Sequence, residues 1–114
     1  MKYITAVFKP SRLDAVLDAV TAAGASGVTV TEVRGYGRQQ GKTEVYRGAE
    51  YEVRLLPKVR IEVAAPAELV ERIVEAIAAT ANTQKIGDGK IFVMDLESVL
   101  RIRTGERNEA ALSS

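Results

Sequence analysis

The sequence contains neither cysteine nor histidine. Without cysteine the chain forms no disulfide and no thiolate metal site, and without histidine it has no imidazole base and no histidine-ligated zinc. Aromatic residues are scarce, at two phenylalanines and four tyrosines. An excess of one charge is lacking too, because 16 basic residues face 15 acidic ones, for a net charge of +1. This balance argues against generalised nucleic-acid binding, so any anion site must be local.

Long apolar runs are also missing. No stretch approaches the roughly 18 uninterrupted apolar residues of a transmembrane helix, because Glu71, Arg72 and Glu75 interrupt the most apolar helical region. The first residues run directly into a strand pattern rather than a secretion signal. We therefore expect a cytoplasmic protein without membrane insertion, and the 114 residues fit a single domain, 1–114.

Hydrophobic periodicity predicts strands that alternate with two helices. The first helix is expected to follow Ser11 as N-cap and to end near Gly24, and the second to begin at Pro66. The residues after Gly105 are expected to form a polar tail. The expected strands are 2–8, about 28–36, 58–64 and 91–96, with a further short strand at 99–105.

This order of elements is typical of an α+β, ferredoxin-like βαββαβ sheet with both helices on one face. The other face is expected to be too polar for an ordinary core, so it needs a cover, which an oligomer interface or a ligand would supply. Its expected side chains are Thr29, Thr31, Arg60, Glu62, Arg101 and Arg103.

One connection is too long for an ordinary turn. The stretch RGYGRQQGKTEVYRGAEYEVR, residues 34–54, is rich in charge and glycine and separates the second strand from the third. Loops longer than about 12–15 residues are uncommon in compact domains and are usually functional or disordered. We interpret this loop as a working part. Within it, Tyr51 is either a contact residue, a modification acceptor, or a surface tyrosine without a role.

The sharpest local motif is GDGK, residues 87–90. Its two glycines allow backbone N–H groups to converge on an anion, and Lys90 adds a positive charge, which suits a polyphosphate. The spacing is not that of a P-loop, and a plain glycine turn is the alternative. Arg101 and Arg103, on the expected last strand, are either a pair of phosphate ligands or solvated arginines. A reactive role for Lys58 would need a lowered pKa, of which the sequence carries no sign.

These motifs resemble the PII nitrogen-signalling proteins. The segments TEVYRGAEY at 43–51, KIGDGKIFV at 85–93 and RIRTGE at 101–106 look like signatures of that family, and the resemblance extends from Met1 to about Leu112. It implies a homotrimer with a T-loop at about 37–55, a B-loop at about 82–90, and a C-terminal loop and tail at about 102–114.

The resemblance also implies ligands. ATP and ADP would compete for clefts between subunits, and with ATP a Mg²⁺ ion held by Gln39 would accompany 2-oxoglutarate, bound by Gln39, Lys58 and Gly87. Two positions depart from the family pattern: Gln84 replaces a frequent glycine, and Lys42 a frequent histidine. The implied nucleotide-binding residues are Thr29, Gly37, Arg38, Gln39, Glu62, Ala64, Gly87, Asp88, Gly89, Lys90, Arg101 and Arg103.

The implied output is control of other proteins. Arg47 would enter the pore of an ammonium transporter and so recruit the protein to the membrane, and a nucleotidylyltransferase would act on Tyr51. Nitrogen-metabolism enzymes or regulators would be further partners. We therefore expect a non-enzymatic sensor. The alternatives are a small ferredoxin-like phosphate-ester hydrolase that uses Arg38 or Arg103, and an RNA-binding module, which the scarcity of aromatic residues disfavours.

Overall fold

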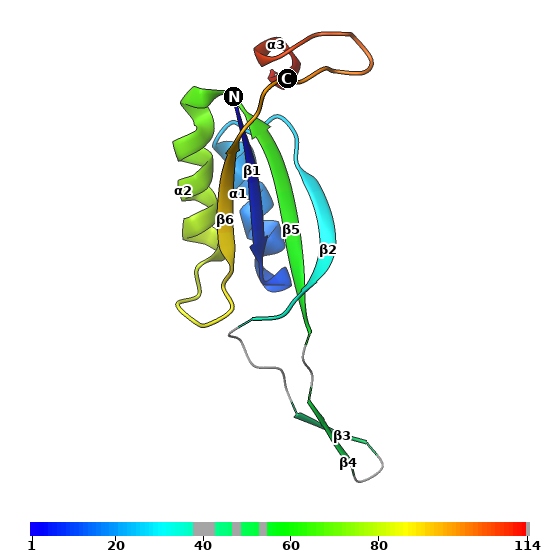
Figure 1. Cartoon of the computed structure of the whole chain (residues 1–114). Helices are drawn as coiled ribbons and strands as arrows, with labels where there is room; N and C mark the ends of the chain where they lie inside the picture. Colours follow the sequence, from blue (N-terminus) through cyan, green and yellow to red (C-terminus); the bar gives the residue numbers. More distant parts are fainter. Residues whose placement is uncertain (38–42, 47–48, 53–54, 114) are drawn as a thin grey trace.

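Alternating apolar residues build a four-stranded antiparallel sheet in the order β2-β5-β1-β6 (Figure 1). The computed structural model describes residues 1–37, 43–46, 49–52 and 55–113, with 43–46 and 49–52 described by their backbone alone. The α+β, ferredoxin-like prediction is confirmed. The strands are β1 (Lys2–Phe8), β2 (Thr29–Gly35), β5 (Leu56–Ala65) and β6 (Lys90–Asp95).

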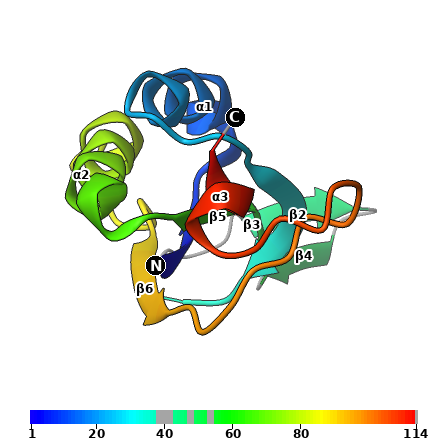
Figure 2. The ribbon, with the colours of Figure 1, turned by 90° about the horizontal axis from the view of Figure 1, so that it is seen from above.

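Two helices, α1 (Leu13–Ala22) and α2 (Val70–Ala81), cover one face of this sheet (Figure 2). Each follows a short 3-10 turn, η1 (Pro10–Arg12) or η2 (Ala67–Leu69). The predicted starts are therefore wrong, since Ser11 lies inside η1 and Pro66 precedes η2. The predicted stop at Gly24 is confirmed, because Gly24 follows the C-cap of α1 with a φ of 108° that favours glycine.

The core lies between the helices and the sheet. Ile4 of β1 pairs with Val63 of β5, and Ala6 pairs with Ile61, so their side chains share the helix-facing side. All four are buried, together with the inward residues of both helices. Burial of this apolar surface is the main force that holds the layers together.

The opposite face of the sheet is polar, as the sequence predicts. Thr29 of β2 pairs with Glu62 of β5, and Thr31 pairs with Arg60. Tyr3 donates a hydrogen bond to Glu62, and this bond, more than burial, raises the pKa of Tyr3. Phe92 and Met94 are about half exposed, at 49% and 51%. A mixed surface of this kind on the uncovered side of a sheet is suited to an interface.

The C-terminal segment departs from the prediction. Residues 102–104 form a turn rather than a strand, and Leu100 makes only an isolated bridge to Arg107. The turn is closed where the N–H of Gly105 bonds the carbonyl of Arg101 at 2.8 Å. Ile102 is 96% exposed, so the alternation of apolar residues here has no core to face. The expected polar tail folds back and includes α3 (Glu109–Leu112).

The long loop lies at the other end of the sheet. It contains a hairpin of β3 (Thr43–Tyr46) and β4 (Ala49–Glu52), which projects beyond the end of β2 (Figure 1). No secondary structure was expected there. Among the described residues, no helix is both long and apolar enough to cross a membrane.

Candidate functional site

A cleft of about 610 Å³ opens at the base of the long loop. The end of β2, the start of β5 and the loop before β6 form most of its wall, and Val7 of β1 and the first residues of β6 complete it. These parts meet because β2 pairs with β5 while β6 pairs with β1. The lining residues are Val7, Gly35, Tyr36, Gly37, Leu56, Lys58, Lys85, Ile86, Gly87, Asp88, Gly89, Lys90 and Phe92.

The GDGK motif forms one side of this cleft and needs both glycines. Gly87 and Gly89 have φ angles of 92° and 105°, a region that residues with a side chain rarely adopt. A Cβ atom on Gly89 would lie only 1.8 Å from the carbonyl oxygen of Val7. Close approach of the motif to β1 therefore requires glycine at this position.

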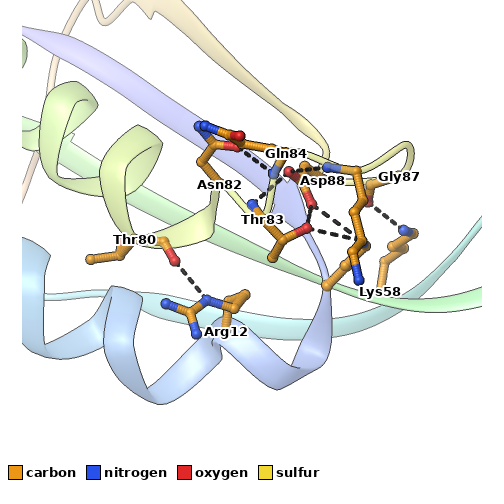
Figure 3. A network of polar contacts seen from close by, with 10 residues as sticks. Arg12, Lys58, Thr80, Asn82, Thr83, Gln84, Gly87 and Asp88 are labelled. Carbon is orange, nitrogen blue, oxygen red and sulfur yellow. Dashed lines mark hydrogen bonds and ion pairs between the residues drawn. The ribbon is translucent and has the colours of Figure 1, made fainter.

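Asp88 holds the loop together from inside (Figure 3). Its carboxylate accepts hydrogen bonds from the backbone N–H of Thr83 at 2.7 Å, from the Thr83 hydroxyl, and from the backbone N–H of Lys85 at 3.4 Å. Lys9 adds an ion pair at 3.2 Å. These contacts, above all the bond from the Thr83 hydroxyl, hold the pKa of Asp88 well below its usual range. Asp88 is thus ionised at neutral pH and part of the cleft wall.

Lys58 joins β5 to the same loop. Its Nζ donates a hydrogen bond to the carbonyl oxygen of Gly87 at 2.6 Å (Figure 3). Burial lowers the pKa of Lys58, and the positive charge of Lys9 lowers it further, while Asp88 raises it. The structure therefore brings Lys58 and Gly87 together.

The loop begins at the end of α2, and two side chains fix this junction. Arg12 donates to the carbonyl of Thr80 at 2.7 Å, which satisfies one of the last carbonyls of the helix. Asn82 accepts a bond from the backbone N–H of Gln84 at 2.7 Å. Gln84 itself has a φ of 59°, a left-handed conformation. The residue that departs from the family pattern thus occupies a backbone position that favours glycine.

Other predicted site residues lie at the far end of the sheet. Thr29 begins β2, six residues before Gly35, which corresponds to about 20 Å along a strand. Ala64 lies near the end of β5, and Glu62 pairs with Thr29. Within one chain the predicted nucleotide site is therefore divided into two groups.

Arg101 belongs to this far group, and its guanidinium contacts its own chain. It bonds the carboxylate of Glu106 at 2.7 Å, the carbonyl of Ala111 at 3.0 Å, and the carbonyl of Ser113. Arg103 lies exposed in the neighbouring turn. The prediction that both arginines point to one face of a strand is wrong, because that strand does not form.

Three predicted residues, Arg38, Gln39 and Arg47, lie outside the described residues. Tyr51 lies in β4, where its backbone pairs with Glu44. Within the part of the chain that the structure describes, no group of three or more His, Cys, Asp or Glu residues could hold a metal ion.

Two residues of the site escaped sequence reasoning. Lys9 and Thr83 are 74 positions apart, and Lys9 lies just after a strand whose register must be known before the contact can be inferred. The sequence gives a weak indication for Thr83, because a threonine and an aspartate flank a short segment that contains glycine, as in many hydrogen-bonded loops.

Comparisons with known proteins place the chain among characterised sequences. A family model described as "Nitrogen regulatory protein P-II" matches residues 1–106. A protein of Rhizobium etli named "Nitrogen regulatory protein P-II" is 59% identical over 112 residues, which cover 98% of this chain and 100% of the relative. Proteins of Haemophilus influenzae, with the same name, and Escherichia coli strain K12, "Nitrogen regulatory protein P-II 1", are 59% and 56% identical with the same coverage.

Proposed function

The chain belongs to the nitrogen regulatory protein P-II family, and from this premise we propose that it is a non-enzymatic sensor of ATP, ADP and 2-oxoglutarate. The relatives carry the names of regulatory proteins, so the phosphate-ester hydrolase is not favoured. In this proposal the chain is one domain whose long loop signals to partner proteins whether ligands are bound.

A single observation carries the proposal: the cleft joins the GDGK motif to the base of the long loop. Gly37 and Lys58 line it from one side, and Gly87–Lys90 from the other. Backbone N–H groups of a glycine loop and nearby lysines are suited to phosphate oxygens. A ligand that contacts both sides would bias the conformation of the loop root, which is how occupancy would reach a partner.

The divided site supports a homotrimer. Thr29 lies on β2, at the opposite edge of the sheet from the strand that follows Gly89. Ala64 pairs with Tyr3 near the start of β1, whereas Lys90 pairs with Val7 near its end. Arg103 lies in the C-terminal turn. In the proposed assembly this far group, with Glu62 and Arg101, comes from a neighbouring subunit and completes the nucleotide site. Burial of the mixed sheet face, which includes Phe92 and Met94, would accompany assembly.

Magnesium and 2-oxoglutarate are proposed to join ATP in the same cleft. Gln39 would contribute an oxygen ligand to Mg²⁺, which otherwise takes oxygen from phosphates and water. Lys58 already contacts Gly87 and would bind a carboxylate of 2-oxoglutarate. The proposed oxygen-rich ligand set suits a hard cation.

The proposed partners meet the long loop. An ammonium transporter would receive Arg47 and recruit this otherwise cytoplasmic protein to the membrane, and a nucleotidylyltransferase would modify Tyr51. A nucleotidyl group adds negative charge and bulk at the loop, which would remove partner contacts. Nitrogen-metabolism enzymes or regulators complete the set.

The test is calorimetric titration of 2-oxoglutarate in MgATP, in MgADP and without nucleotide, with the oligomeric state measured by light scattering. We expect a trimer that binds 2-oxoglutarate strongly in MgATP only. Lys58→Met should abolish this binding, whereas the matched control Lys85→Met, which removes the same charge from the cleft wall, should retain it. Binding that ignores the nucleotide would contradict the proposal.

A further inference from the structure

Lys9 lies behind the GDGK loop rather than in the cleft. Its Nζ is 3.2 Å from a carboxylate oxygen of Asp88 and 3.3 Å from the hydroxyl of Thr83. The two charged side chains are 18% and 20% exposed, so the pair is largely removed from water. Among the described residues, Asp88 lines the cleft and Lys9 does not. Lys9 therefore meets a ligand through the loop, and Asp88 is the charged group of the loop that it contacts.

Asp88 puts two requirements of the loop in conflict. The loop needs the carboxylate, because it accepts the backbone N–H groups of Thr83 and Lys85. A bound polyphosphate would be repelled by the same negative charge, and repulsion between like charges strengthens where water is excluded. A carboxylate in the wall of an anion site thus requires a compensating cation.

We propose that Lys9 is the counter-charge of Asp88, a positioning residue that lets the GDGK loop keep its structural carboxylate and still accept a polyphosphate. The inference rests on the proposed nucleotide function. With Lys9 and Asp88 paired, the positive charges of Lys58, Lys85 and Lys90 dominate the cleft wall. Loss of Lys9 would leave a partly buried negative charge beside the phosphates.

A merely structural role for Lys9 predicts a different outcome. Lys9 also contacts Thr83, so its loss could loosen the loop and weaken binding without any electrostatic repulsion. Such loosening would occur whether or not residue 88 is charged. Repulsion, by contrast, disappears when residue 88 becomes neutral. A double-mutant cycle with Asp88 separates the two cases.

The experiment measures the dissociation constant of MgATP for wild type, Lys9→Met, Asp88→Asn and the double variant, at low and high salt. Lys9→Met should weaken binding on the order of tenfold at low salt and less at high salt, because salt screens the repulsion. In the Asp88→Asn background the same substitution should change binding less than twofold. Lys9→Arg, which keeps the charge, should bind like wild type.

If Lys9→Met weakens MgATP binding equally in the wild-type and Asp88→Asn backgrounds, or in neither, the counter-charge role of Lys9 is overturned. Circular dichroism and light scattering confirm that each variant folds and assembles. Wild type that binds no MgATP would instead contradict the proposed function. Carbon NMR titration of the Asp88 carboxyl tests the pairing of Lys9 with Asp88 without any nucleotide: the pKa of Asp88 must rise in Lys9→Met, and an unchanged pKa would refute the inference.

Discussion

At the cleft end of the sheet Lys9 and Lys58 bond to the loop that precedes β6, whereas at the opposite end Arg101 bonds to the chain's own C-terminal segment. All three are cations held by oxygen atoms of nearby backbone or carboxylate. The partners of the lysines belong to a loop that borders an open cleft, so these contacts shape a binding surface. The partners of Arg101 belong to a tail that folds over it.

The role of a cation therefore depends on which acceptor groups of its own chain already bond to it in place of a ligand. Arg101 would have to exchange the carbonyls of Ala111 and Ser113 for phosphate oxygens before it could bind a nucleotide. Lys58 already lines the cleft while it bonds to the carbonyl of Gly87. Substitutions at matched positions of the two ends test this difference.

The largest effect is expected at glycines with positive φ. Gly89→Ala should reduce MgATP affinity by more than about 100-fold, because the new Cβ would collide with the backbone of Val7 and displace the loop. Gly105→Ala, at a φ of 74° with open space around it, is the matched control. It should cost only about 1 kcal/mol of folding free energy. Titration calorimetry and thermal unfolding measure both effects, and equal losses of affinity would contradict the distinction.

The second comparison concerns the arginines of the tail end. Arg101→Met should speed amide hydrogen exchange in residues 109–113 on the order of tenfold, because their carbonyl contacts with the guanidinium are lost. Arg103→Met, in the exposed turn, removes the same charge and should leave exchange unchanged. Mass spectrometry of peptides that cover the C-terminus reads this out. If the two variants behave alike, Arg101 does not hold the tail.

The sequence predicts most of the sheet because burial leaves a periodic trace. Val59, Ile61 and Val63 alternate with polar residues, and all three are buried in β5. The same kind of alternation at Leu100 and Ile102 was misleading, since no core faces that segment. Periodicity alone carries no information on whether a partner layer exists. The cap predicted at Ser11 failed because a 3-10 turn, which needs no side-chain cap, starts the helix instead.

The site was predictable in part. GDGK was predicted as an anion-binding motif with a plain glycine turn as the alternative, and the family resemblance implied a carboxylate ligand at Lys58. The structure brings Lys58 and Gly87 together, and their roles as ligands stay predictions. The contact between Lys9 and Asp88 was not predictable, because it joins segments far apart in sequence through the register of β1 and β6. Nor could the sequence reveal that Arg101 contacts the tail, which requires the chain to reverse at Gly105.

Acid stability provides the third comparison. The pKa of Asp88 lies well below its usual range and that of Glu106 is lowered as well, in both cases first by a threonine hydroxyl. A carboxyl with a lowered folded pKa stabilises the protein above its unfolded pKa, about 4, and this stability is lost as pH falls toward the folded value. Asp88→Asn should therefore flatten the decline of unfolding free energy below about pH 4.

Glu106→Gln should flatten the same decline less, because Glu106 is 42% exposed against 20% for Asp88, and water screens its contacts. Urea titrations between neutral pH and acid, at one protein concentration, measure both slopes. A steeper acid decline in Asp88→Asn than in wild type would contradict the assignment.

The smallest effect is expected at two non-glycine residues with positive φ. Gln84→Gly should stabilise the protein by about 0.5 kcal/mol. The relief of strain in the left-handed conformation should slightly exceed the cost of the extra conformational entropy that glycine gives the unfolded chain and that is lost on folding. Asn108, with a φ of 56° and a ψ of −130°, is the non-glycine residue with positive φ at the tail end. Its side chain accepts the N–H of Val99 at 3.2 Å, so Asn108→Gly also loses a hydrogen bond and should not stabilise. Thermal unfolding distinguishes the two substitutions. If both stabilise the protein, backbone strain alone determines the stability at these positions. If only Gln84→Gly stabilises it, the tail end, unlike the cleft loop, offsets its backbone strain through a side-chain contact.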